Sequence, residues 1–283
     1  MPAFRTHLPG MDLVKTELTR FRTAAETTLL LGGLGVLLSI IGILAFGLEG
    51  VIFGPVGLAA VAIVQVGRID WLLRLHRVRP VHPASRQGRL FRALMQRSGL
   101  SGVGLYVKPA AALNAFAAAD GTKAAVVVAA PILERFPEDE LAGILGHELT
   151  HIRNDDVRVM GAASTLARMV THTGVIAVLA AILGPLFGAP RAEPVGTMLA
   201  ALSVAVLATW MTARLSRTRE FAADLGAATL LGSPVPLARA PERLDRYARW
   251  LTPPWLQPLT RRSLHDSHPA TGERLERLGS YVA

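Results

Sequence analysis

Two histidines and a glutamate in the middle of the chain have the spacing of metal-binding and acid–base residues. His147 and His151 stand four positions apart, and Glu148 directly follows the first of them. On an α-helix, four residues turn the chain by only about 40° more than one full turn, so both imidazoles project from one face. Two neutral imidazoles in this arrangement can hold one zinc ion, and the neighbouring carboxylate can reach a water bound to the same metal. The motif therefore predicts the chemistry of a zinc peptidase, with Glu148 as the general base.

The residues around this motif predict the helix that it requires. Pro137 stands where a helix would begin, and the acidic residues after it would lie near the positive end of the helix dipole. Apolar residues then recur at helical spacing, at Leu141, Ile144, Leu145 and Ile152. Such a stripe allows one side of the helix to be buried. Because a motif this short also occurs by chance in proteins without a metal, the alternative is a helix with two surface histidines.

A third metal ligand is needed, because a catalytic zinc ion usually has three protein ligands and one open position. The first good candidate is Glu220, which has Asp224 one helical turn after it. Glu220 could ligate the metal while Asp224 accepts a hydrogen bond from a ligand imidazole. A Glu–Asp pair beside arginines is also typical of a solvated ion-pair face. The spacing alone leaves both interpretations open.

Two pairs of apolar runs lie on either side of the motif. Thr28–Leu48 and Gly50–Gly67 precede it, and Met169–Pro190 and Pro194–Ala213 follow it. A helix of about 20 apolar residues matches the roughly 30 Å hydrocarbon core of a bilayer. We therefore predict two transmembrane hairpins. The alternatives are a cleaved signal peptide for the first run and buried helices of a soluble core for the later pair.

The two hairpins would divide the chain into five segments. In order, these are an N-terminal segment, the first hairpin, a catalytic region with the HExxH motif, the second hairpin and a catalytic region with the third ligand: residues 1–27, 28–67, 68–168, 169–213 and 214–283. Lysines and arginines gather outside the hairpins and are scarce in their turns. By the positive-inside rule, both termini and the catalytic regions then face the cytoplasm, in a bacterial-type inner membrane.

The composition agrees with a membrane protein. Hydrophobic residues make up 51% of the 283 residues, and the formal net charge is +9. This charge is explained by the topology and by attraction to anionic lipids. We expect no nucleic-acid partner, because the basic residues flank apolar runs and form no recognition motif. The chain contains no cysteine, which excludes disulfides and thiolate metal ligands and fits a reducing compartment.

Three short segments before the motif read as strands. They are Val103–Val107, Asn114–Ala118 and Ala124–Ala129, and Asp120-Gly121 is a turn signal between the second and the third. This layout predicts a small antiparallel sheet beside the helix of the motif. Its edge strand could bind an extended peptide through main-chain hydrogen bonds.

Taken together, the motifs resemble the HtpX family of membrane-bound zinc metalloproteases, which are relatives of the CAAX prenyl endopeptidases. The segments that carry the resemblance are Asn114–Ala117, Glu138–Asp156, Ser216–Asp224 and His268–Leu275. They occur in the family's order, with apolar hairpins in the family's positions, so the resemblance covers nearly the whole chain. It implies an α+β, mainly helical, multi-pass membrane protein with a zincin-like (gluzincin) catalytic domain and a small antiparallel sheet.

The resemblance also implies a role for each matching residue. His147, His151 and Glu220 would bind one zinc ion per chain, Glu148 would be the catalytic base, and Asp224 would support a ligand. The strand residues Asn114, Ala115 and Phe116 would bind substrate backbone. His268 and Arg274 would stabilise developing charge, although a helix-capping or ion-pair role is equally open for both.

The resulting hypothesis is a zinc endopeptidase that cleaves misfolded or damaged membrane proteins, as part of quality control and stress response. Its partners would be these substrates and the lipid bilayer. One alternative is a non-catalytic membrane scaffold or transporter with a structural zinc site. Another is an intramembrane protease with the motif inside a span, which the charged residues around the motif oppose because burying charge in a bilayer is costly.

Overall fold

The computed structural model describes residues 13–64, 69–109, 113–187, 194–237, 239–240 and 243. These residues are mainly helical and include one small sheet. They fall into two compact units, one within Met1–Leu58 and Leu166–Met211 and the other within Ala59–Thr165 and Thr212–Ala283. We call the first the helical unit and the second, which contains the sheet, the sheet unit.

A helical hairpin opens the helical unit. Helix α1 (Leu13–Phe46) is followed by a 3-10 helix, η1 (Gly47–Ile52), and by α2 (Phe53–Val64). Glycines let the two arms touch, because a Cβ on Gly50 would collide with the carbonyl of Gly42, and one on Gly54 with the carbonyl of Gly35. Such close backbone approach through small residues is typical of helix pairs in membranes.

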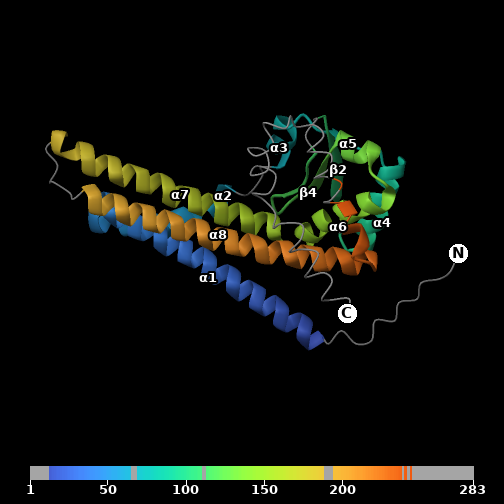
Figure 1. Cartoon of the computed structure of the whole chain (residues 1–283), viewed down its shortest axis with the longest axis horizontal. Coiled ribbons are helices and arrows are strands. Elements are labelled where there is room, and N and C mark those ends of the chain that lie inside the picture. The colour runs from blue at the N-terminus through green and yellow to red at the C-terminus, as the bar shows by residue number, and fades with distance from the viewer. Residues whose placement is uncertain are drawn as a thin grey trace. The chain divides into compact units, whose positions relative to one another are not determined.

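Helices α7 (Asp156–Leu183) and α8 (Pro194–Leu231), with η2 (Gly184–Phe187) after α7, supply the rest of the helical unit through Leu166–Met211, and their outer ends belong to the sheet unit. A Cβ on Gly174 of α7 would lie 3.4 Å from the side chain of Ala201 of α8 and 3.7 Å from Ile41 of α1. The three helices are thus packed together within this unit (Figure 1).

Three helical stretches of the described chain are long and apolar enough to cross a membrane. They are Ala25–Ile63, Asp156–Leu186 and Val195–Leu231. Many large apolar side chains on them are exposed in the isolated protein, including Leu179, Leu202 and Trp210. The protein is therefore a multi-pass membrane protein by fold. The first stretch contains both arms of the hairpin, and α8 continues well beyond the apolar run that the sequence marked.

The sheet has four strands in the order β1-β2-β4-β3. Their bounds are Arg79–Pro80, Val103–Lys108, Ala115–Ala119 and Ala124–Ala129 for β1 to β4. The predicted hairpin of β3 and β4 is antiparallel, but β2 and β4 pair in parallel, so the prediction of a purely antiparallel sheet was wrong. The reason is strand order. The apolar β4 is buried along almost its whole length and lies inside the sheet, whereas the alanine-rich β3 lies at the edge.

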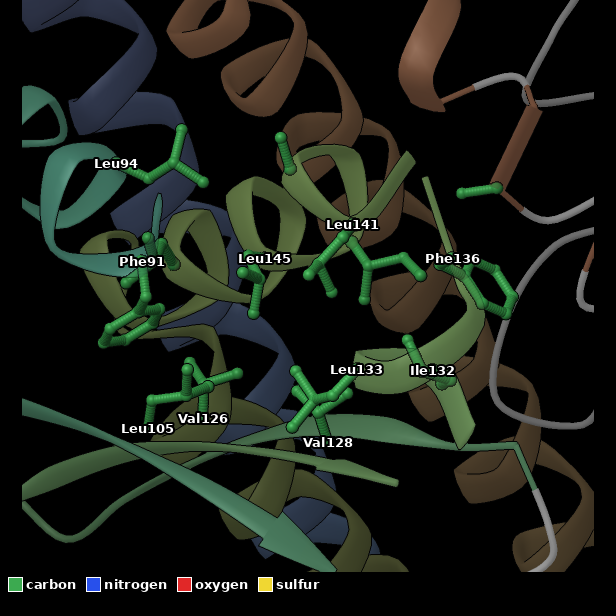
Figure 2. Close-up of a cluster of buried hydrophobic side chains, with 14 of the residues drawn as sticks. Phe91, Leu94, Leu105, Val126, Val128, Ile132, Leu133, Phe136, Leu141 and Leu145 are labelled. Carbon is green, nitrogen blue, oxygen red and sulfur yellow. The ribbon is translucent and has the colours of Figure 1, made fainter. Parts of the chain in front are cut away.

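One face of this sheet carries the main core, which is shown in Figure 2. Side chains from α4 (Arg86–Arg97), α5 (Ala130–Arg135) and α6 (Glu138–Arg153) meet the strands there. The core includes Phe91, Leu94, Leu105, Val126, Val128, Ile132, Leu141 and Leu145. The other face packs against α3 (Ile69–Leu75).

Helix α6 confirms the predicted helix around the HExxH motif. It begins directly after Pro137, and every residue from Glu140 to Thr150 is buried. The stripe of Leu141, Ile144 and Leu145 packs in the core, so the hydrophobic effect fixes the rotation of the helix and with it the direction of its histidines.

Candidate metal centre

Three side chains from two helices converge in the sheet unit. His147 and His151 come from α6, and Glu220 comes from α8. The three side chains form a small triangle: the two histidine Nε2 atoms are 3.1 Å apart, and the two carboxylate oxygens of Glu220 lie 3.3 Å from His147 Nε2 (Oε2) and 3.6 Å from His151 Nε2 (Oε1). His147 and Glu220 are buried, and His151 is nearly so. The fold thus brings together His151 and Glu220, which are 69 positions apart in the sequence.

The dimensions of this triangle fit a zinc ion. Zinc bonds to imidazole nitrogen and carboxylate oxygen are about 2.0–2.2 Å long, so the edges of a tetrahedral site measure roughly 3.3–3.6 Å. The distance between the two Nε2 atoms, 3.1 Å, and the distances from each Nε2 to the nearer Glu220 oxygen, 3.3 and 3.6 Å, are close to these values. Two imidazoles and one carboxylate are also a ligand set found in catalytic zinc sites. His147, His151 and Glu220 could therefore hold a metal ion.

Each histidine of the triangle has a carboxylate behind it. His147 Nδ1 lies 3.0 Å from Asp224 Oδ1, and His151 Nδ1 lies 2.9 Å from Asp156 Oδ2. A proton on each Nδ1 can then be donated to a carboxylate, which leaves each Nε2 lone pair directed at the centre of the triangle. Asp224 thus lies behind a candidate ligand as the sequence predicted, and Asp156 lies in an equivalent position that the sequence motifs did not predict.

Asp156 is itself held by a buried arginine. Arg219 Nη1 donates a hydrogen bond of 2.7 Å to Asp156 Oδ1, and both side chains are almost fully buried. Because Arg219 precedes Glu220 on α8, this contact joins α6, the start of α7 and α8 around the triangle. The signal in the sequence was the acidic pair after the motif. It could not be interpreted without knowing that Asp155, between α6 and α7, adopts a left-handed backbone conformation (φ 58°).

The electrostatics of the cluster favour a positive charge at its centre. Burial of His147 opposes the charged imidazolium, but hydrogen bonds to Asp224 and Glu220, together with the negative charges of these carboxylates, outweigh burial and raise the pKa of His147 to about 10. A group of buried carboxylates needs a cation or a proton among them. A divalent metal ion satisfies that demand with the imidazoles neutral.

Glu148 is buried on α6 directly beside the first histidine. Within the described part of the chain, its carboxylate makes no hydrogen bond or ion pair. A buried carboxylate without such partners is costly to keep. Its place beside a candidate metal-binding histidine is where a general base is needed.

The strand residues singled out from the sequence lie at the edge of the sheet. Asn114 is exposed and its carbonyl accepts a hydrogen bond of 2.8 Å from Ala129 N. Ala115 packs with the core on the α6 face. The Phe116 side chain lies on the opposite face, with its ring centroid 5.4 Å from that of His76. The fold therefore separates Phe116 from the face that carries α6. His268 and Arg274 lie outside the described residues.

Comparison with known proteins decides the family. A model of peptidase family M48 matches residues 84–282. A protease HtpX homologue of Trichormus variabilis is 34% identical over 278 residues, covering 89% of this chain and 94% of the relative. Another, from Kineococcus radiotolerans, is 34% identical over 284 residues, covering 92% and 97%.

The chain belongs to peptidase family M48, among the HtpX homologues. The resemblance stated from the sequence motifs is thereby confirmed. As a member of M48, the chain is a membrane-associated metalloprotease, with the candidate metal site in its sheet unit.

A solved structure supports the fold of this M48 peptidase. The crystal structure of S. mikatae Ste24p is similar with a TM-score of 0.50 and 18% sequence identity. The match covers 94% of this chain and 66% of Ste24p, so the chain spans about two-thirds of that larger protein. At this identity the similarity shows the fold alone.

Proposed function

We propose that this M48 peptidase is a zinc-dependent endopeptidase that cleaves misfolded or damaged membrane proteins. His147, His151 and Glu220 are its zinc ligands, with one ion per chain, and Glu148 is its general base. The observation that carries the proposal is the cluster of His147, His151 and Glu220, whose side-chain nitrogen and oxygen atoms lie 3.1 to 3.6 Å apart beside the buried Glu148.

The chemistry follows from the residues around the triangle. A bound zinc ion would polarise the scissile carbonyl and lower the pKa of a coordinated water. Glu148 accepts the proton of the attacking water and delivers it to the leaving amine. Asp224 and Asp156 hold the imidazoles in the tautomer that presents Nε2 to the metal. We assign His268 or Arg274 to stabilising the charge that develops on the carbonyl oxygen.

We propose that the substrate binds at the edge strand of the sheet, β3. In an antiparallel pair, alternate residues use their backbone groups for the ladder, and those between them face outward. Asn114 and Asp120 bond to β4, because Ala129 N donates to Asn114 O and Asp120 N donates to Lys123 O. By this alternation, the backbone groups of Ala115, Ala117 and Ala119 face the open edge. An extended peptide can add there as a further strand, in line with a role for Asn114, Ala115 and Phe116.

We place the enzyme in the inner membrane of a bacterial-type cell. Residues 68–168 and 214–283 would face the cytoplasm and residues 28–67 and 169–213 would cross the bilayer. The support is the three stretches that could span a membrane and the clustering of basic residues beside them. A protease anchored in this way meets membrane-protein substrates as they unfold.

The test compares wild type with Glu148→Gln in detergent or in lipid vesicles. We expect both proteins to bind one zinc ion and only the wild type to cleave an unfolded membrane protein. Glu134→Gln is the matched control, because Glu134 is an exposed glutamate on α5 of the same unit. Cleavage by Glu148→Gln at the wild-type rate would refute the assignment of the base. Stoichiometric zinc in a wild type that cleaves no substrate would favour a scaffold with a structural metal instead.

A further inference from the structure

Helix α3 has one buried face and one solvent-exposed face. Ile69 is 4% exposed, and with Leu72 and Leu73 it packs against the sheet. On the outer side, Trp71 and Leu75 are each 60% exposed. These two side chains stand four positions apart, so they lie on the same face of the helix. An exposed tryptophan and leucine on one helix face form a continuous apolar surface, and such surfaces mark sites of contact with proteins or membranes.

The position of α3 in the chain indicates what that partner is. Only residues 65–68 separate α3 from the described end of α2, which lies at the end of the candidate span Ala25–Ile63. Exposed arginines follow the solvent-exposed face, at Arg74, Arg77 and Arg79. Tryptophan is enriched at the level of lipid headgroups, and arginines there attract anionic lipids.

We propose that α3 lies in the lipid headgroup region, with Trp71 and Leu75 inserted towards the acyl chains and the arginines bound to anionic headgroups. A helix of seven residues binds lipid weakly by itself. Here the apolar helix just before it holds it at the bilayer, so its contact with lipid is effectively intramolecular.

This membrane contact is joined to the substrate edge of the sheet. Asp120, in the turn between β3 and β4, accepts a hydrogen bond of 3.2 Å from Ile69 N. Lys123, in the same turn, pairs with Asp70 at 2.7 Å. These two contacts therefore hold α3 against the β3–β4 turn. A helix fixed at the headgroups sets the height of the β3 edge above the bilayer, a consequence that rests on the proposed role of this edge in binding substrate.

The absence of cysteine from the chain makes a direct test possible. Trp71→Cys and Leu75→Cys each carry a single environment-sensitive fluorophore in the full-length protein, reconstituted in vesicles of phosphatidylcholine with phosphatidylglycerol. Gln96→Cys is the matched control, because Gln96 is exposed on α4 of the same unit. We expect nitroxide-labelled lipids to quench the labels at positions 71 and 75 several-fold more strongly than the label at 96. Equal quenching at all three positions, with equal access to an aqueous quencher, would overturn the proposal.

The charge in the proposal is tested separately. Arg74→Gln should weaken lipid quenching of the label at position 75 in vesicles with phosphatidylglycerol, whereas Arg92→Gln, on α4, should not. Loss of amide-hydrogen exchange from α3 on moving the unmodified protein from detergent into these vesicles is expected as well. Unchanged exchange would count against the membrane contact even if a labelled variant folded poorly.

The link to substrate has its own readout. The double variant Trp71→Ser, Leu75→Ser should cleave a bilayer-embedded substrate several-fold more slowly than wild type and a soluble unfolded protein at the same rate. Equal losses on both substrates would remove the link to the β3 edge while leaving the lipid contact intact. A wild type that cleaves neither substrate would refute the proposed function, and the fluorescence results would still decide the position of α3.

Discussion

At the scale of single residues, the candidate centre depends as much on its supporting carboxylates as on its donor atoms. The two imidazoles are held differently. Asp224 lies behind His147, and Asp156, which lies behind His151, is also paired with Arg219. The buried ion pair with Arg219 fixes the position of the Asp156 carboxylate. A change in that position would alter the orientation of the His151 imidazole and thus the geometry of the candidate metal site.

Asp156→Asn should weaken zinc binding by about 10- to 100-fold, because the amide can no longer accept from His151 and Arg219 as a carboxylate does. Competition with a chromophoric chelator measures the affinity. Asp155→Asn, at the neighbouring exposed position, should leave it unchanged. Equal affinities for the Asp156 variant and wild type would show that the carboxylate does not position the ligand.

A second buried carboxylate affects stability instead. Burial of Asp120 opposes its charge, but hydrogen bonds from Thr122, Lys123 and Ile69 outweigh burial and lower its pKa from 3.8 to about 2. Because the folded-state pKa is depressed, the stabilisation is complete above pH about 4 and is lost as pH falls towards about 2.

Asp120→Asn should therefore lower the free energy of unfolding by about 1–3 kcal/mol at neutral pH, and the difference from wild type should vanish near pH 2. Denaturation of both metal-free proteins in detergent measures it. A difference that stays constant over this pH range would mean that the effect comes from packing and not from the charge.

At the scale of elements, backbone geometry determines both which groups β3 presents at the sheet edge and how closely the α1–α2 hairpin packs. The outward backbone groups of β3 alternate with those that hold β4. The arms of the α1–α2 hairpin meet where glycine leaves no side chain between them. In each case, the same substitution at two chosen positions is expected to have different effects.

Proline can separate substrate binding from folding on β3. Ala117→Pro removes an N–H that faces the open edge, so cleavage should fall at least about tenfold while thermal stability changes little. Ala118→Pro removes an N–H that bonds to β4, so it should lower stability by about 3 kcal/mol or more. Thermal unfolding and peptide cleavage of both variants check this. Full activity of Ala117→Pro would place the substrate elsewhere.

Alanine substitution probes the hairpin of the helical unit. Gly50→Ala should lower stability by about 1–3 kcal/mol, since its methyl group would collide with the Gly42 carbonyl. Gly32→Ala is the control, because nothing lies within 4 Å of a Cβ there, and it should raise stability by up to about 1 kcal/mol. Unfolding of both variants in detergent gives the two signs, and a stable Gly50→Ala protein would argue against the close contact.

At the scale of the whole molecule, local features could be predicted from the sequence and long-range ones could not. The apolar periodicity of residues 138–153 predicted α6. The spacing of Glu220 and Asp224 did not decide between a metal ligand and an ion-pair face, and only the family resemblance predicted Glu220 as the partner of the two histidines. The parallel pairing of β2 with β4 depends on strand order, which no local pattern encodes. The same holds for Asp156, because its place beside His151 follows the left-handed backbone conformation of Asp155 between the two helices.

Metal removal should show how far the centre holds the sheet unit together. Its three donors join α6 to α8, so chelation should lower the thermal midpoint of wild type by several degrees. Glu220→Gln should start from a lower midpoint and respond less to the chelator. Calorimetry with and without added zinc makes the comparison. An equal response of the two proteins would show that Glu220 takes no part in binding.

The separation of the donors along the chain has a consequence for synthesis. His147 and His151 leave the ribosome long before Glu220, and the apolar runs of α7 and α8 come between them. A nascent chain therefore holds only two of the three proposed ligands until Glu220, inside the last candidate span, has been made. Domains made early fold early, but this centre is closed only when α8 arrives. A chain that ends before Glu220 lacks the third proposed ligand, so it could not form the proposed metal site.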